Sequence, residues 1–128
     1  MSSPLTATDL VARLGVSRKT GDRLAAYVAL LATWQKQINL VGPSTLADPW
    51  RRHILDSAQL MPHIAAGSSV VDLGSGAGFP GLVLAILGDF DVHLIESDQR
   101  KAVFLREAAR VTRAAVTVHA RRLETVTD

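Results

Sequence analysis

The chain has 128 residues, of which 48% are hydrophobic and 20% are charged, a balance that is typical of one globular domain and excludes a disordered chain. It contains no cysteine, which excludes disulfides, thiolate zinc sites and a cysteine nucleophile, and its apolar stretches are shorter than the ~20 residues that a membrane span needs. The 14 Lys and Arg residues exceed the 12 Asp and Glu residues by two, which is compatible with RNA binding without indicating it.

Residues 1–66 predict a helical region that begins with a short amphipathic helix. Thr6 or Thr8 is expected as its N-cap, and Gly15 is a typical helix stop. The apolar positions that recur at helical spacing in this segment are Leu5, Leu10, Val11 and Leu14.

A longer helix is expected to begin after Ser17, which is a suitable N-cap. It should end between Asn39 and Gly42, because a Gly-Pro pair breaks the pattern there. Its apolar stripe consists of Leu24, Val28, Leu31 and Ile38, with Trp34 near the edge. A third helix is expected at about residues 49–61.

Residues 67–128 alternate between strands and helices. Short β-branched runs predict strands at 69–73, 91–96 and 115–120, and Gly74 closes the first of them. Helices are expected at 80–87, with Pro80 in the first turn, and at 98–112, with Asp98 as the cap. Strands separated by helices of this length form βαβ units, so we predict an α/β fold with a parallel sheet.

Three strands are about half of the six that a doubly wound, Rossmann-like sheet usually has. We therefore expect residues 67–128 to form the first half of such a sheet, within one compact domain, and we interpret the chain as truncated at its C-terminus. The first strand normally lies in the middle of the sheet, and here it would be an exposed edge.

The segment 72–81, Asp-Leu-Gly-Ser-Gly-Ala-Gly-Phe-Pro-Gly, follows the first strand directly. Glycines at such a place let the backbone approach a ligand, and the next helix offers its N-terminal N–H groups. Two ligands are compatible with this pattern. Gly76 begins a formal match to the dinucleotide fingerprint G-x-G-x-x-G. The other candidate is S-adenosylmethionine (SAM), because Gly74, Gly76 and Gly78 are preceded by Asp72 at the end of the strand.

The charges of the two ligands favour SAM. A dinucleotide would place an anionic pyrophosphate near Asp72, which would repel it, whereas SAM carries an ammonium and a sulfonium that a carboxylate attracts. We therefore expect Asp72, Gly76 and Gly78 to contribute to a SAM site. Asp72 could instead serve only to accept backbone N–H bonds of the loop.

Glu96 closes the second strand, 24 positions after Asp72. An acid at the tip of the strand after a glycine loop is suitably placed to accept both ribose hydroxyls of an adenosyl group. The alternative is a carboxylate exposed at the strand end. Asp98 is a weaker candidate for the ribose, because its expected position as a helix cap already explains it.

Several motifs together resemble the RsmG (GidB) family, whose members methylate guanine N7 in 16S ribosomal RNA. The glycine loop alone is typical of SAM methyltransferases in general, and its combination with the upstream RHILDS sequence makes the resemblance specific. The matching positions are Trp34, residues 39–40, 52–57, 72–81 and 96–97, Lys101, Phe104, Leu105, Arg106 and residues 122–124.

The resemblance implies a SAM cofactor and names its contacts. Gly74 and Phe79 would touch SAM at the glycine loop, and Glu96 would lie at the ribose. Leu123 and Glu124 would flank the adenine. The family pattern continues beyond residue 128 with a fourth strand, so the resemblance leaves activity of this chain by itself in doubt.

The resemblance also places Asn39, His53 and Asp56 in helices that pack over the cofactor cleft, as candidates for the substrate pocket. It implies 16S ribosomal RNA, in the small subunit or its precursor, as the partner of a cytoplasmic protein. We expect a monomer without a metal ion or membrane association, and no catalytic residue is identified.

Methylation of guanine N7 removes no proton, so the reaction needs no general base and positioning can supply most of the catalysis. Two other classes stay open. One is a nucleotide-dependent oxidoreductase, and the other is a cofactor-binding fragment without turnover.

Overall fold

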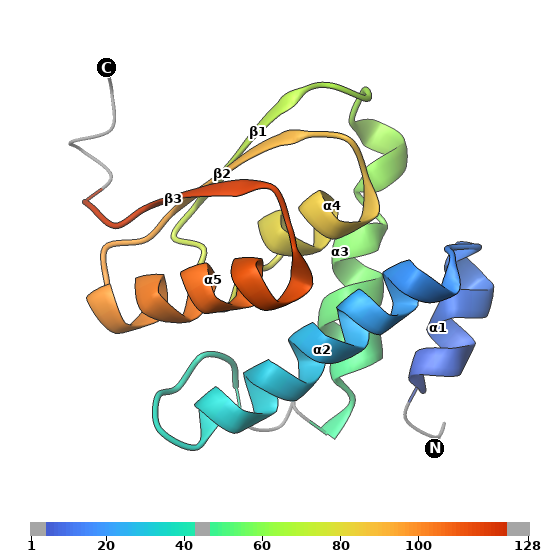
Figure 1. Ribbon diagram of the computed structural model, residues 1–128, viewed down its shortest axis with the longest axis horizontal. Coiled ribbons are helices and arrows are strands. Elements are labelled where there is room, and N and C mark those ends of the chain that lie inside the picture. The colour runs from blue at the N-terminus through green and yellow to red at the C-terminus, as the bar shows by residue number, and fades with distance from the viewer. Residues whose placement is uncertain (1–4, 43–46, 123–128) are drawn as a thin grey trace.

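A three-stranded parallel sheet with helices packed on one of its faces forms the second half of the molecule (Figure 1). The computed structural model describes residues 5–42 and 47–122. The strands β1 (Ser69–Leu73), β2 (Asp91–Ile95) and β3 (Val116–His119) lie side by side in this order. Helices α4 (Gly81–Leu87) and α5 (Gln99–Thr112) connect them. The predicted α/β fold is confirmed, and the boundaries of these three strands and two helices differ from the predicted ones by no more than one residue.

β1 has a neighbouring strand on one side only within the described residues, as expected of an edge. Because side chains alternate along a strand, Val71 and Leu73 point away from the face that carries α4. Both of these apolar side chains are 55% exposed. A parallel sheet normally has both faces covered, and here, among the described residues, the face of β1 opposite α4 is exposed.

The helices before the sheet are α1 (Ala7–Leu14) and α2 (Arg18–Gln35). The Thr6 side chain accepts the N–H of Asp9, whose carboxylate accepts the N–H of Thr6 in return, so the first helix begins with a capping box. Gly15 ends it in the left-handed conformation, with φ of 64°. Ser17 caps α2. The predicted starts of both helices are confirmed.

The predicted end of α2 between Asn39 and Gly42 is wrong, because the helix stops at Gln35. The side-chain oxygen of Gln35 accepts the N–H groups of Leu40 and Val41, and its amide donates to the Val41 carbonyl. This side chain closes a loop over the next six residues and replaces the helical hydrogen bonds. Ile38 is buried as expected, but in the turn rather than in the helix.

The predicted helix at 49–61 is present as a continuous helical run from residue 49 to residue 58, and a separate turn completes the segment. A π-helix, η2 (Trp50–Leu55), leads into one turn of α-helix, α3 (Asp56–Ala58), and a 3₁₀ turn, η3 (Met61–His63), follows. The spacing of apolar residues does not distinguish these helix types over so short a segment, because a π-helical turn differs from an α-helical turn by only about one residue. π-Helical turns are rare and frequently lie at functional sites.

One hydrophobic core joins the helical region to the sheet. Leu24, Tyr27 and Leu31 of α2 are fully buried and belong to the same cluster as Leu94 of β2 and Phe104 of α5. In Figure 1, α2 runs below α5 and α4, on the side away from the strands. No helix of the described residues has the length and apolar character to span a membrane.

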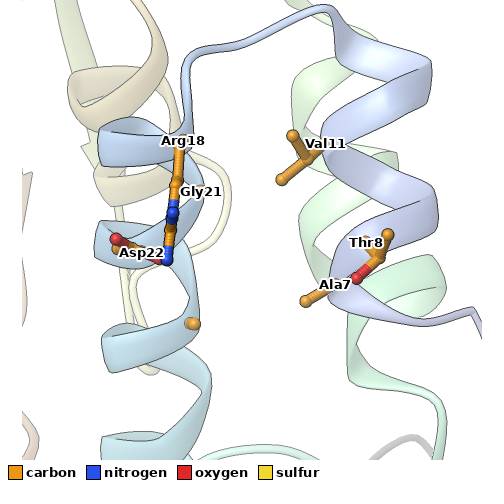
Figure 2. A pocket seen from close by; sticks show the side chains of 7 residues that line it. Ala7, Thr8, Val11, Arg18, Gly21 and Asp22 are labelled. Atoms are coloured by element: carbon orange, nitrogen blue, oxygen red, sulfur yellow. The ribbon is translucent and has the colours of Figure 1, made fainter.

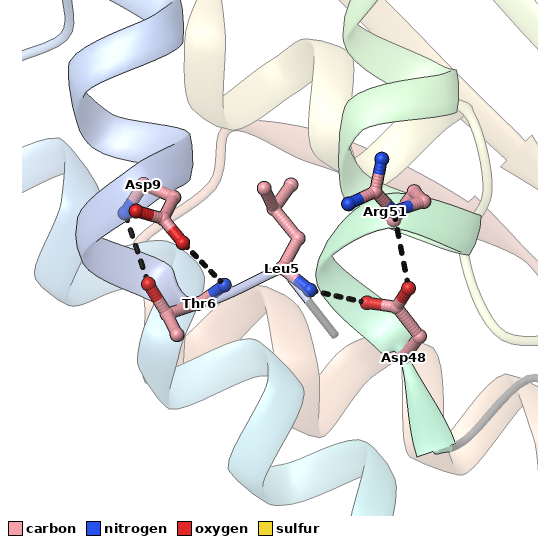
Figure 3. A network of polar contacts seen from close by, with 5 residues as sticks. All are labelled: Leu5, Thr6, Asp9, Asp48 and Arg51. Carbon is pink, nitrogen blue, oxygen red and sulfur yellow. Dashed lines mark hydrogen bonds and ion pairs between the residues drawn. The ribbon is translucent and has the colours of Figure 1, made fainter. Parts of the chain in front are cut away.

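A polar network fixes the first turn of the chain to the π-helical segment (Figure 3). Asp48 accepts the backbone N–H of Leu5 at 2.8 Å with one carboxylate oxygen. Its other oxygen accepts Nε of Arg51 at 3.1 Å. Asp48 therefore connects segments that lie 43 residues apart in the sequence.

Candidate functional site

The glycine loop between β1 and α4 exposes bare backbone at its first two glycines. Gly74 and Gly76 have positive φ values of 67° and 53°, which side chains other than glycine rarely adopt. A Cβ atom on Gly74 would meet no atom within 4 Å, and one on Gly76 would meet only the Gly74 carbonyl oxygen, at 3.9 Å. A ligand can therefore approach the backbone at these two residues.

Gly78 and Gly81 face the core instead. A Cβ atom on Gly78 would lie 2.6 Å from the Tyr27 hydroxyl, and one on Gly81 would lie 2.5 Å from a methyl group of Leu94. These two glycines let the loop and α4 pack closely on α2 and β2. A backbone contact between Gly78 and a cofactor stays a prediction, since packing already explains its glycine.

The Glu96 side chain is 7% exposed and holds the glycine loop. Its Oε1 accepts the backbone N–H of Gly76 at 2.7 Å, and its Oε2 accepts that of Asp98 at 2.9 Å. The alternative of a carboxylate exposed at the strand end is therefore wrong. Each carboxylate oxygen has a second lone pair, so Glu96 can still accept hydrogen bonds from a ligand.

Asp72 binds the start of α4, with its Oδ2 accepting the backbone N–H of Gly81 at 3.0 Å. Asp72 thus accepts a backbone hydrogen bond, as the alternative interpretation expected. Its other carboxylate oxygen, Oδ1, can still contact a ligand. Burial raises the pKa of Asp72 above its ordinary value of 3.8, and the nearby negative charge of Glu96 raises it further. The hydrogen bond from Gly81 acts in the opposite direction.

These two carboxylates decide which ligand charge suits the loop. The backbone N–H groups of Gly76 and Gly81, which could have bound a phosphate, already donate to Glu96 and Asp72. An anion placed here would lose those donors and face two negative charges. The arrangement favours a cationic ligand with hydroxyl groups over a pyrophosphate.

A hollow of about 260 Å³ lies at the carboxyl ends of β1 and β2, lined by Leu73, Gly74, Ile95, Ser97 and Arg121. Ligands of open α/β sheets bind at this end of the strands. Apart from Gly74, these residues were not among the predicted contacts, although Leu73 and Ser97 lie in segments that match the family motifs. Leu123 and Glu124, which the resemblance places at the adenine, lie outside the described residues.

Tyr27 supports the glycine loop from below. Its buried hydroxyl donates a hydrogen bond to the Ala77 carbonyl, and its ring lies 5.3 Å from that of Phe79, centroid to centroid. Burial raises the Tyr27 pKa well above 10, and the negative charge of Asp72 adds to the effect. Tyr27 was missed in the sequence, although it falls between Leu24 and Val28 on the same helical stripe.

A second hollow, of about 280 Å³, lies between the π-helical segment and the end of the glycine loop. We call it the base groove; its lining residues are Arg52, His53, Asp56, Ser57, Leu60, Phe79 and Pro80. The His53 ring stacks on the Phe79 ring, with centroids 4.6 Å apart and planes 11° apart. The structure therefore brings two predicted pocket residues, His53 and Asp56, to a predicted cofactor contact.

Asn39 does not join them. It is exposed in the turn after α2 and does not line the base groove. His53 is half-buried, and burial lowers its pKa below 6.5. The positive charge of Arg52 acts in the same direction, and Asp56 opposes it. His53 is therefore mostly neutral at pH 7.

A third hollow, of about 300 Å³, lies between α1 and α2 and shares no residue with the loop or the base groove (Figure 2). A Cβ atom on Gly21 would lie 2.6 Å from a methyl group of Val11, so glycine is needed for the approach of the two helices. In Figure 2, Val11 points toward α2 from the facing helix. We attribute this hollow to helix packing. Within residues 5–42 and 47–122, no group of three or more His, Asp or Glu side chains could hold a metal ion.

Comparison with known proteins relates these sites to a family. Residues 21–128 match the profile of GidB, described as rRNA small subunit methyltransferase G. The chain belongs to the GidB family. The match includes the π-helical segment, the glycine loop and Glu96, so the resemblance seen in the sequence motifs is confirmed.

Three curated relatives of this GidB chain carry the name ribosomal RNA small subunit methyltransferase G. The protein of Rhodospirillum centenum is 67% identical over 119 residues, which are 92% of this chain and 55% of that protein. The proteins of Paramagnetospirillum magneticum and Rhodospirillum rubrum are 60% and 57% identical, with 92% and 94% of this chain and 58% and 60% of each relative covered. The chain thus spans little more than half the length of these relatives.

Proposed function

We propose that this chain contains the cofactor-binding half of a SAM-dependent methyltransferase that modifies guanine N7 in 16S ribosomal RNA. The observation that carries the proposal is that two backbone N–H groups, of Gly76 in the loop and Gly81 at the start of α4, donate to the carboxylates of Glu96 and Asp72. Membership of the GidB family and the names of its relatives support it.

The residues present fit SAM. Gly74 and Gly76 leave room on the open side of the loop, and Glu96 keeps lone pairs for the two ribose hydroxyls. The free oxygen of Asp72 suits the ammonium group of SAM. We propose the hollow beside Ile95 and Ser97 for the adenosyl group.

When bound, SAM supplies an electrophilic methyl group on its sulfonium. The protein has no proton to remove, because guanine N7 attacks through an in-plane lone pair. Its tasks are to bring N7 into line with the methyl group and to exclude water. The carboxylates around the loop also stabilise the positive charge that develops on the base. We therefore assign positioning roles to these residues and no general base.

We propose that the protein acts as a monomer in the cytoplasm, on the small ribosomal subunit or its precursor. A second candidate is cofactor binding without turnover by this chain alone. Among the described residues β1 is an edge strand and Val71 and Leu73 are exposed, and both observations favour this candidate, because a parallel sheet in an enzyme is normally covered on both faces. An oxidoreductase is less well supported, since its dinucleotide would meet two carboxylates at the loop.

Calorimetric titration with S-adenosylhomocysteine, with NAD as the control, tests the proposal. Saturable binding of S-adenosylhomocysteine alone supports the methyltransferase assignment, and binding of NAD alone overturns it. Transfer of labelled methyl from SAM to small subunits that lack the modification then separates the two candidates. Binding without transfer by this chain, together with transfer by a full-length relative, identifies it as a cofactor-binding part.

A further inference from the structure

The base groove lies beside the cofactor loop, and its chemistry is that of a nucleobase site. Phe79 and Pro80, at the end of the loop, form one wall, and Arg52, His53 and Asp56 form the other. Its volume of about 280 Å³ is close to the lower limit of ~300 Å³ for small-molecule pockets. The groove is therefore suited to one flat ring system rather than to a large ligand.

The His53 and Phe79 rings stack on each other, with centroids 4.6 Å apart, so no base can lie between them and a base can stack only on an outer face of this pair. Bases stack on such surfaces regardless of their identity, because every base has a π-face. Burial and the charge of Arg52 keep His53 neutral, so the surface does not repel the positively charged product of N7 methylation. Stacking gives affinity for any base. Discrimination between guanine and adenine needs a polar group that contacts the edge of the base.

Asp56 provides that group. Asp56 is exposed and lines the groove beside His53, whose charge it influences. An ionised carboxylate only accepts hydrogen bonds. Guanine presents two adjacent donors, N1–H and the 2-amino group, on its Watson–Crick edge. Adenine presents an acceptor at N1, which a carboxylate repels.

We infer that the base groove binds the target guanine with its Watson–Crick edge toward Asp56 and its N7 toward the glycine loop. The two edges lie on opposite sides of the purine, so a base held by Asp56 turns N7 away from Asp56, toward the cofactor side of the groove. Arg52, exposed at the rim, suits the phosphate of the same nucleotide. The inference rests on the proposed function and adds a specificity-determining residue to it.

Titration of the isotope-labelled chain with guanosine, adenosine and inosine 5′-monophosphates, followed by NMR, tests the inference. Guanosine monophosphate should shift the backbone signals of Arg52, His53, Asp56 and Phe79, and should bind about tenfold more tightly than adenosine monophosphate. Inosine monophosphate lacks the 2-amino donor and should bind with intermediate affinity.

Three variants and one control separate the roles. Asp56→Asn should remove most of the preference for guanine while S-adenosylhomocysteine binds as before. His53→Ala should weaken binding of all three nucleotides by a similar factor, about fivefold, and His53→Phe should restore it. Asp22→Asn changes another exposed aspartate, in α2 and outside the groove, and should have no effect.

Equal binding of the guanine and adenine nucleotides, or an unchanged preference in Asp56→Asn, overturns the inference. The inference is also overturned if nucleotide at about 10 mM shifts no NMR signal of the base groove, because binding too weak to detect at that concentration would not be specific. S-adenosylhomocysteine binding measured in parallel keeps the two proposals distinct. A chain that binds it but shows no guanine preference loses only the role of Asp56.

Discussion

Arg23 of α2 holds the ends of two other helices, and its loss should destabilise the whole domain. Its Nε donates to the carbonyl of Thr112 at 2.6 Å, and its two terminal nitrogens donate to the carbonyls of Arg113, at 3.2 Å, and Ile86, at 3.4 Å. The last carbonyls of a helix have no partner within it and carry the negative end of its dipole. One guanidinium thus satisfies the ends of α4 and α5.

Replacing Arg23 with Met keeps an unbranched side chain and removes all three hydrogen bonds. A hydrogen bond from a charged group contributes ~1.5–3 kcal/mol. The Ile86 bond is long, and the Arg113 bond is exposed, so we count the Thr112 bond in full and the others in part. We expect the free energy of unfolding to fall by about 2–4 kcal/mol, out of ~5–15 kcal/mol for a typical domain.

Urea unfolding followed by circular dichroism measures the loss. Arg106→Met, at an exposed position of α5, is the matched control and should change stability by no more than about 0.5 kcal/mol. Arg23→Lys should lie between the two, because an ammonium cannot reproduce the planar fork of donors. A loss below about 1 kcal/mol in Arg23→Met would refute the reasoning, because it would show that water replaces the guanidinium at all three carbonyls.

Three further predictions concern the loop. The stability of Asp72→Asn relative to the unmodified chain should increase as pH rises from 3.8 through the raised pKa of Asp72, because ionising the buried carboxyl costs stability and the amide does not ionise. Urea unfolding at several pH values measures this difference in stability. A difference that does not change with pH contradicts the prediction. Gly76→Val should lower the free energy of unfolding by about 1–2 kcal/mol, because φ at this residue is 53°. It should also abolish S-adenosylhomocysteine binding in calorimetry. Normal binding by this variant would mean that the loop has only a structural role. Tyr27→Phe loses the bond to the Ala77 carbonyl and should lower stability by about 1 kcal/mol and cofactor affinity severalfold. If its affinity is unchanged, Tyr27 does not position the loop.

The features that could be predicted from the sequence depend on local spacing. The caps at Thr6, Ser17 and Asp98 need only the few residues that follow them, and each is present. The alternation of β-branched runs and amphipathic segments likewise sufficed for the parallel sheet, since the βαβ connection allows few other arrangements.

The features that were missed depend on contacts that no local pattern encodes. Glu96 was expected at a ribose, but its bond to the N–H of Gly76, 20 residues away, follows only from the close approach of two strand ends. Gln35 ends α2 through its side chain, whereas glutamine is an ordinary helix residue by propensity. The π-helical turn at Trp50–Leu55, which brings His53 onto Phe79, has no recognised sequence signature.

β1 is an edge strand within residues 5–42 and 47–122, and this position has a consequence for the synthesis of a longer GidB chain. β1 is made before β2 and β3, yet it lies at the edge, so any later strand that extends the sheet on that side must pair with the oldest strand. A ribosome adds ~5–20 residues per second. A nascent chain would therefore leave the edge of β1 unpaired, and the side chains of Val71 and Leu73 exposed to solvent, for seconds. Chaperone capture in that interval would protect the chain from pairing with a second nascent copy.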